Sequence, residues 1–527
     1  MADTKREIER KYEATDETRL PDLTKVAGVS SVVDRGVAEL DAVYYDTPDL
    51  RLAANAITLR RRTGGSDEGW HLKLPVSPDV RDEIHAPLGP DLPHALTGLV
   101  RSRIRDAPLV PAVRLLSSRE LCHLVDAAGK PLAEVSIDAV TAQRLDAGAA
   151  TANWTEIEVE LADGVGPAFL DVVEKRLRKA GVRPASSASK LARALEDTAP
   201  PQEAPEAGRK QAPHTPKKQG RGRRAAKTPG ADTAGDHVLA YLRAQAEAIV
   251  AYDPAVRRDL PDSVHQLRVA TRRLRSAFRS YRKVVDPAVT DPIAGELKWL
   301  AGELGVDRDH EVLNDRLQAR ITDLPRTLLL GPVRGRLRIW SVARRTGSRR
   351  KTIAVLDSRR YLDLLNALDA LLADPPLLRA AAQPAATVVP KAITKDYDRL
   401  STRMEHALAL PPGTGERDAA MHDARKAAKR ARYAAEAARP VLGKPAKRFA
   451  KRLKAVQSVL GDHQDSVVAR EALRTLAIQA HAAGETAFTW GLLHGQEEAQ
   501  AAIRERELPE VWARASRPEL RADLGGR

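Results

Sequence analysis

The order of apolar and polar residues divides the chain into two halves of different character. In the first half, short segments alternate apolar and polar side chains, as a β-strand with one buried face does. The alternation is clearest at 43–48, 57–60, 70–74, 132–138 and 154–161. Helical spacing occurs only locally, at 168–180 and 187–197. The pattern predicts an α+β module over residues 1–197, dominated by antiparallel sheet.

The rest of the chain has no such alternation. Residues 198–232 are rich in Pro, Ala, Gly, Lys and Arg and hold almost no aliphatic side chain that could anchor a core, so we expect a disordered basic linker. From residue 233 to about 520, long runs rich in Ala, Leu and Arg have helical spacing. This part is predicted to be a separate all-α domain.

The helical part repeats itself. Segment 264–275 corresponds to segment 421–432, with histidines 157 residues apart. A Lys seven residues before a Leu-Gly-x-x-x-Asp motif follows in both copies, and the two lysines and the two glycines are 156 residues apart. Agreement over two separated motifs indicates an internal duplication, and therefore two pseudo-symmetric helical bundles. We expect both Leu-Gly-x-x-x-Asp motifs to be turns.

The charge of the chain is unevenly distributed. Residues 1–198 carry 27 basic and 32 acidic side chains, the linker from 199 to 232 carries 8 and 3, and the remainder carries 51 and 36. The excess of basic residues in the helical domain favours polyanions as partners, whether nucleic acid, anionic membrane or polyphosphate. A single cysteine excludes an intramolecular disulfide and a site built on paired thiolates. Without a signal-like or membrane-spanning apolar run, we expect a cytoplasmic protein, with polyphosphate granules as a possible location.

The run from Glu7 to Tyr12 carries the first candidate site. In a strand, Glu7, Glu9 and Lys11 share one face, while Ile8 and Tyr12 share the other. Two acids and a base on one wall suggest a divalent metal and a phosphate. A solvated edge strand would show the same alternation, and this run alone does not separate the two interpretations.

Later strands add further charges of both signs. The basic candidates are Arg60, Arg62, Lys73, Arg81, Arg114, Arg119 and Lys190, and the acidic ones are Glu134, Asp138, Glu156, Glu158 and Glu160. Three like charges on one strand face, as at 156–160, require a metal, cations or water. Arg61 has the parity of an outward-facing side chain. We interpret Tyr45, Trp70 and Trp154 as core residues, and His71 and His85 as ordinary surface or core histidines.

In this order, the motifs resemble the CYTH domain of the triphosphate tunnel metalloenzymes over residues 3–197. The resemblance rests on Glu7-x-Glu9-x-Lys11, Tyr45-Asp46-Thr47-Pro48, Leu59-Arg60-x-Arg62, Trp70-x-x-Lys73, Glu134 with Asp138, Glu156-x-Glu158, and Ser189-Lys190 with Arg193. It implies an eight-stranded antiparallel β-barrel that encloses a tunnel, with Mg²⁺ or Mn²⁺ as cofactor. Glu7, Glu9, Asp138, Glu156 and Glu158 are the implied metal ligands. Lys11, Arg60, Arg62, Lys73, Arg119 and Lys190 would bind the substrate phosphates, and Glu7, Glu9, Lys11, Glu156 and Glu158 form the implied catalytic set.

The duplicated helices carry the second candidate site. Spacings of three, four and seven residues place His265, Arg268, Arg272, Arg275 and Arg279 on one helix face, and His422, Arg425, Lys429 and Arg432 on another. A solvated face is the ordinary interpretation of a single such helix, but it does not explain why the order of side chains repeats. Both helices and both Leu-Gly-x-x-x-Asp motifs resemble the CHAD domain over residues 233–520, which implies two four-helix bundles that bind inorganic polyphosphate. Lys298 and Lys454 are predicted as additional phosphate contacts, while Asp309 and Asp465 would cap helices or orient the basic side chains.

Together these observations predict a metal-dependent triphosphatase barrel joined to a polyphosphate-binding domain. The substrate would be inorganic triphosphate or a related triphosphorylated compound. The main alternative is a non-catalytic polyphosphate receptor or scaffold. Adenylate cyclase and thiamine triphosphatase activities occur on similar barrels, but no residues clearly recognise adenine or thiamine. Nucleic-acid binding is disfavoured, since aromatic residues make up 4% of the chain and none interrupts the basic stripes.

Overall fold

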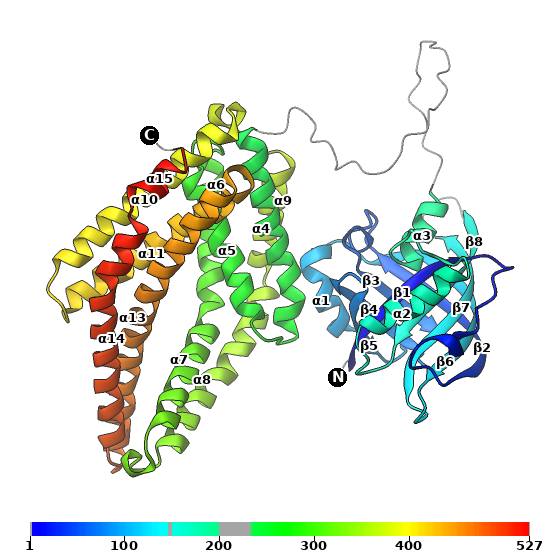
Figure 1. Cartoon of the computed structure of the whole chain (residues 1–527), viewed down its shortest axis with the longest axis horizontal. Coiled ribbons are helices and arrows are strands. Elements are labelled where there is room, and N and C mark those ends of the chain that lie inside the picture. Colours follow the sequence, from blue (N-terminus) through cyan, green and yellow to red (C-terminus); the bar gives the residue numbers. More distant parts are fainter. Residues whose placement is uncertain (1–2, 146–149, 200–232, 526–527) are drawn as a thin grey trace. The chain divides into compact units, whose positions relative to one another are not determined.

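A computed structural model describes residues 3–145, 150–199 and 233–525, apart from the side chains of 306–308 and 343–348. Almost all of the predicted linker, residues 198–232, therefore lies outside the described residues. The chain forms two compact units, Met1–Gln219 and Gly220–Arg527, which are described separately below (Figure 1).

The first unit is a closed antiparallel barrel of eight strands, as the resemblance implied. Its strands are β1 (Asp3–Ala14), β2 (Ser31–Asp46), β3 (Thr58–Thr63), β4 (Gly69–Ser77), β5 (Val80–Ala86), β6 (Val110–Val125), β7 (Pro131–Arg144) and β8 (Thr151–Leu161). They follow the order β5-β4-β3-β2-β6-β7-β8-β1. Strand β1 closes the barrel, because its first half pairs with β5 and its second half pairs with β8. A two-residue strand, β9 (Arg183–Pro184), also pairs with β1.

Helices cover the outer face of the barrel with apolar side chains. They are α1 (His94–Ile104) and α2 (Ala168–Lys179), whereas Leu191 and Ala194 of α3 (Lys190–Asp197) pack against inward-facing side chains of β2, β6, β7 and β8. Tyr12 of β1 is fully buried in a cluster with Leu170 and Leu177 of α2. Because side chains alternate along a strand, this packing directs Glu7, Glu9 and Lys11 to the inside of the barrel. Apolar burial outside thus fixes which charges face inward.

The second unit is entirely helical. Its first repeat contains α4 (Ala234–Arg257), α5 (Ser263–Ser280), α6 (Pro287–Glu303), α7 (Gly305–Asp323), α8 (Val333–Leu356) and α9 (Arg359–Ala373). Its second repeat contains α10 (Ala385–Ala409), α11 (Gly415–Ala437), α12 (Arg439–Leu442), α13 (Lys444–Ala482), α14 (Phe488–Ala515) and α15 (Pro518–Ala522). None of the described helices has both the length and the apolar character that a membrane span needs.

The two repeats share their apolar cores. The larger core joins α4–α6 and α9 to α10, α11, and parts of α13 and α14. A smaller core lies among α7, α8 and the remaining parts of α13 and α14, where Figure 1 shows two long helical hairpins. The basic helices α5 and α11 pack against each other, and Arg273 of α5 forms an ion pair of 3.0 Å with Glu436 of α11. The duplication thus brings its two basic segments side by side.

One predicted turn is wrong. Gly305 lies at the junction of α6 and α7, but Gly461 lies inside the continuous 39-residue helix α13. A Cβ atom built on Gly461 would lie 3.5 Å from the Arg425 guanidinium, and one on Gly305 would lie 2.9 Å from that of Arg268. An arginine therefore lies against the glycine in both repeats, but only at Gly305 would a Cβ atom be closer than ordinary van der Waals contact.

Candidate functional sites: a charged barrel cavity and a basic helical cluster

The barrel encloses a cavity of about 800 Å³ lined by charged side chains from most of its strands. Nine lysine or arginine and seven acidic side chains line it. The basic residues are Lys5, Lys11, Arg35, Arg60, Arg62, Lys73, Arg81, Arg119 and Lys190, and the acidic ones are Glu7, Glu9, Asp67, Glu83, Glu134, Glu158 and Glu160. The alternative of a solvated edge strand therefore fails for β1, since Glu7 and Glu9 are buried at 4% and 8% exposure.

Glu7, Lys73 and Glu83 form one linked group on neighbouring strands. The Lys73 ammonium lies 2.6 Å from Glu7 Oε2 and 3.8 Å from Glu83 Oε1. Burial, supported by a hydrogen bond to Glu83 and the negative charge of that carboxylate, outweighs the attraction of Lys73 and raises the pKa of Glu7 to about 8. Burial acts in the same direction on Glu83, but Lys73 and His71 outweigh it and lower the pKa of that carboxyl. The pKa values of these two neighbouring carboxyls are thus displaced in opposite directions.

Glu9, Lys11 and Glu158 form a second group, where β1 pairs with β8. The Lys11 ammonium contacts the Glu158 carboxylate directly and lies 3.3 Å from Glu9 Oε1. Burial acts to raise the pKa of Glu9, but Lys11 and Lys73 outweigh it, and the pKa is lowered. The same balance, with Lys11 and Lys190 as the main cations, keeps the pKa of Glu158 well below its usual range. Both carboxylates are therefore ionised and face the cavity.

A third group lies around Lys190, at the start of α3. Its ammonium is 3.0 Å from Asp138, 2.9 Å from Glu156 and 2.6 Å from Glu158. Arg119 makes a bidentate ion pair with Asp138 at 2.6 and 2.9 Å and contacts Glu158 at 2.9 Å. Carboxylate oxygens of Asp138, Glu156 and Glu158 lie within 4.8 Å of one another, close enough to hold a metal ion.

The cavity contains residues that the sequence prediction missed. One of them is Glu83, which contacts Lys73, Arg60 and His71. In the sequence, Glu83 shares a strand face with Arg81, but strand parity alone does not show whether that face points into the barrel. His71 is buried at 1% exposure and also bonds the carbonyl of Asp67, so it is a core histidine that touches the site.

Other predicted residues divide clearly between cavity and surroundings. Arg62 contacts Asp67 directly, and burial together with neighbouring Arg60 lowers its pKa to about 10. Arg114 pairs with Asp41 at 2.6 Å on an exposed face and does not line the cavity. Trp154 is buried, as predicted for a core residue, but its indole N–H also donates to Glu156 at 2.7 Å.

The helical unit gathers four cations from its two basic helices. Lys429 of α11 lies among Arg425 of the same helix and Arg268 and Arg272 of α5, and Asp465 is the acid that faces it. Burial and repulsion by Arg425 and Arg272 lower the pKa of Lys429 to about 7. Such a concentration of like charge is unfavourable without a counter-anion.

Each repeat places an aspartate beside its first arginine, although the contact is closer in the first repeat. Arg268 lies 3.0 Å from Asp309, and its guanidinium donates to the carbonyl of Gly305 at 3.1 Å. Arg425 lies 3.7 Å from Asp465. Asp309 and Asp465 therefore orient basic side chains, one of the two roles predicted for them.

The remaining basic candidates have different surroundings. Arg275 has a lowered pKa because it is partly buried and lies near Arg279 and Arg272. Arg432 is held by Gln457 and Glu436, and His422 by a hydrogen bond to Gln464. His265 lies in the first turn of α5. Lys298 and Lys454 are exposed on α6 and α13, and their contact with phosphate stays a prediction.

Comparisons with known proteins match both halves of the chain. The CYTH domain model matches residues 5–195, and the CHAD domain model matches residues 240–474. The chain belongs to the family of proteins that join a CYTH domain to a CHAD domain. Two proteins of Mycobacterium tuberculosis, from the strains CDC 1551 / Oshkosh and ATCC 25618 / H37Rv, are each 40% identical over 527 residues, with 96% of both chains covered. Both are described as uncharacterised.

Two solved structures each match somewhat more than half of this chain. PptA from Streptomyces chartreusis is 24% identical, with a TM-score of 0.45, and the match covers 53% of this chain and 99% of that one. The CHAD domain from the plant Ricinus communis is 27% identical, with a TM-score of 0.42, and the match covers 58% and 96%.

The CYTH family generally uses a divalent metal, and the donors of this barrel fit one. All the candidate ligands are carboxylates, which Mg²⁺ and Mn²⁺ prefer. Glu7 Oε2 and Glu156 Oε1 are buried, and each contacts an ammonium group, that of Lys73 at 2.6 Å and that of Lys190 at 2.9 Å. Among the acids, Glu7, Glu9 and Glu158 line the cavity, whereas Asp138 and Glu156 lie behind Lys190.

Proposed function

We propose that the CYTH barrel hydrolyses inorganic triphosphate in a metal-dependent reaction and that the CHAD domain binds inorganic polyphosphate. The observation that supports the first part most strongly is the meeting of nine cations and seven acids in one cavity of about 800 Å³. Cations alone would suffice to hold a polyanion. Buried carboxylates beside them serve a metal.

In this proposal, Glu7, Glu9 and Glu158 hold Mg²⁺ or Mn²⁺. The ion would supply positive charge at a phosphoryl oxygen and a position for water. Asp138 and Glu156 have a supporting role, because they fix the ammonium group of Lys190 at 3.0 and 2.9 Å.

The basic side chains of the tunnel would bind and orient the triphosphate. Lys11, Arg60, Arg62, Lys73, Arg119 and Lys190 approach the cavity from six different positions of the barrel wall. Fixed cations stabilise the charge that develops on phosphoryl oxygens, since they need no reorganisation during the reaction. An ionised carboxylate at the cavity, Glu9 or Glu158, would orient the attacking water in line with the terminal phosphorus.

A Glu7→Gln, Glu9→Gln double variant tests the enzyme assignment. Both changes keep the side-chain shape and replace the proposed carboxylate ligands with amides, so phosphate release from triphosphate with Mg²⁺ or Mn²⁺ should fall at least about 100-fold. The exposed Glu17→Gln variant is the matched control. Full activity of the double variant would refute the assigned site. Triphosphate binding by the wild type without turnover in any divalent metal would instead support a receptor or scaffold.

Polyphosphate binding by the CHAD domain is supported by the cluster of Arg268, Arg272, Arg425 and Lys429. A linear polyanion can contact guanidinium and ammonium groups from both helices at once. Arg272→Gln with Lys429→Gln should weaken polyphosphate binding at least about tenfold, and Arg474→Gln, an exposed change on α13, should not. Displacement of polyphosphate by duplex DNA at moderate salt would show that the ligand is wrong.

A further inference from the structure

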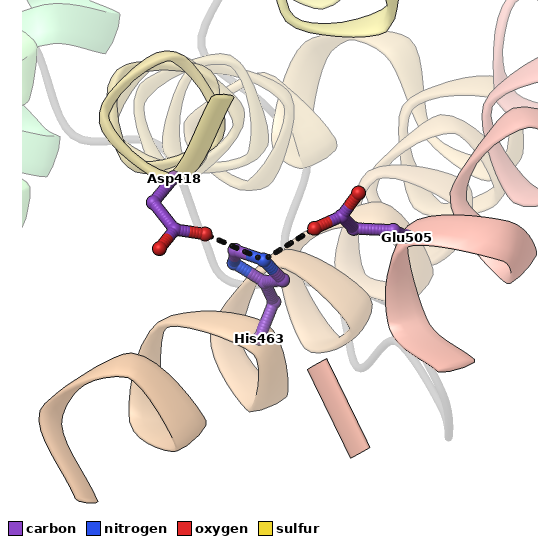
Figure 2. A group of neighbouring side chains, drawn as sticks. All are labelled: Asp418, His463 and Glu505. Carbon is purple, nitrogen blue, oxygen red and sulfur yellow. Dashed lines mark ion pairs between the residues drawn. The ribbon is translucent and has the colours of Figure 1, made fainter. Parts of the chain in front are cut away.

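Three helices of the second repeat bring a histidine and two carboxylates together away from both sites described above. Asp418 lies in the first turn of α11, His463 in the middle of α13 and Glu505 on α14. His463 is 1% exposed and Glu505 is 5% exposed. Figure 2 shows the imidazole edge directed between the two carboxylates, with Nε2 3.2 Å from Asp418 Oδ1 and 3.5 Å from Glu505 Oε1.

Each carboxylate is held through its other oxygen. Asp418 Oδ2 forms an ion pair of 2.9 Å with Arg470, and Glu505 Oε2 forms one of 3.0 Å with Arg417. The backbone N–H of Gly413 also donates weakly to both oxygens of the Glu505 carboxylate, at 3.4 Å to Oε1 and 3.3 Å to Oε2. This arrangement fixes the carboxylates while one oxygen of each stays directed at His463. Carboxylates that bind metals are supported by neighbouring groups in the same manner.

The three converging atoms lack a common partner within the protein. His463 Nε2 is buried and makes no well-directed hydrogen bond in the described structure. A single proton on Nε2 could serve only one of the two oxygens. In a tetrahedral site with bonds of roughly 2.0–2.1 Å, ligand atoms lie about 3.3–3.4 Å apart. The observed separations of 3.2 and 3.5 Å bracket this value.

We propose that Asp418, His463 and Glu505 form a binding site for a divalent transition-metal ion such as Zn²⁺, whose tetrahedral bond lengths match the two observed separations. One imidazole nitrogen and two carboxylate oxygens are ordinary zinc ligands, and a water molecule would complete the tetrahedron. The ion joins the beginning of α11 to α13 and α14. Asp418 precedes His422 by one helical turn, so the ion also adds positive charge next to the basic face of α11.

Among the residues that the structure describes, this group of three occurs in the second repeat and has no counterpart in the first. In the first repeat, Pro261 occupies the position that corresponds to Asp418, and Asp307 the position that corresponds to His463. A proline cannot supply a ligand. The metal is therefore not a general requirement of this helical repeat, but a feature that distinguishes α11 from its counterpart α5.

The test uses the full-length chain carrying Glu7→Gln and Glu9→Gln, which removes two tunnel carboxylates and separates this site from the proposed triphosphatase. After treatment with a chelator, Zn²⁺ binding is measured by equilibrium dialysis with elemental analysis. We expect one tightly bound Zn²⁺ per chain, and an affinity at least about tenfold lower when His463→Gln is added. His481→Gln, at an exposed position of the same helix, is the matched control and should leave binding unchanged.

Two further measurements keep the test decisive if a variant folds poorly. Zn²⁺ should raise the thermal midpoint of the parent chain, because a ligand that binds only the folded state stabilises it. Co²⁺ should give the intense visible absorption of a tetrahedral complex in the parent chain, and this band should be absent with His463→Gln or Asp418→Asn. Equal Zn²⁺ affinity in the parent and a folded His463→Gln chain, or a parent chain without the Co²⁺ band, would refute the proposal and leave a buried ion-pair network.

Discussion

Lys429 offers a quantitative test of the polyphosphate site. Burial and the guanidinium groups of Arg425, Arg272 and Arg268 oppose its charge, Asp465 favours it, and the resulting pKa is about 7. A lysine with a lowered pKa is charged below pH 7 and neutral above it. A bound polyphosphate would favour the charged form, so binding above pH 7 must be accompanied by the uptake of a proton.

The size of the effect follows from this linkage. If bound phosphate restores the usual pKa, affinity at pH 8 should be about tenfold lower than at pH 6, equivalent to ~1.4 kcal/mol. Lys429→Arg keeps a charge at both pH values, because a guanidinium does not lose its proton in this range. The affinity of the Lys429→Arg chain should therefore lack this tenfold decrease between pH 6 and pH 8.

The assay is a titration of labelled polyphosphate with the full-length chain from pH 6 to 8, at constant ionic strength. Ionisation of the polyphosphate itself and of His422 affects wild type and Lys429→Arg alike, so the ratio of their affinities isolates Lys429. A ratio that stays constant over this range would refute the assignment of Lys429 to the binding site or its lowered pKa.

Further predictions concern both domains. Gly305→Ala places a Cβ atom 2.9 Å from the Arg268 guanidinium, against 3.5 Å from Arg425 for Gly461→Ala, so the first change should weaken polyphosphate binding more than the second in the same titration. Arg119→Lys loses the bidentate contact with Asp138, and we expect kcat/KM for triphosphate to fall about 10-fold or more while the circular dichroism spectrum is preserved. Replacing Lys429 with Met removes a buried, repelled charge and should increase the free energy of unfolding by on the order of 1 kcal/mol at pH 6, measured by chemical denaturation; a decrease would contradict the repulsion. Polyphosphate affinity should also decline steadily with added salt, which screens charge contacts.

The amino-acid sequence by itself determined the division into a strand-rich module and a helical domain, the set of β1 side chains that share one face, and the correspondence between the two basic helices, while the barrel was implied by the resemblance to the CYTH domain. These features depend on local periodicity: a strand alternates every second residue, and a helix returns to the same face after three or four. The sequence alone therefore predicted that Glu7, Glu9 and Lys11 share a strand face, and that the basic stripe beginning with a histidine occurs twice.

Only the tertiary structure decided which charges meet. Glu7 joins Lys73 and Glu83 because β1 closes the barrel onto β5, and Lys429 loses proton affinity because α11 packs against α5, more than 150 residues earlier in the chain. The continuous helix through Gly461 and the convergence on His463 likewise depend on neighbours distant in sequence. Long-range packing sets burial and charge proximity, and these determine protonation and ligand binding, which periodicity along the chain does not encode.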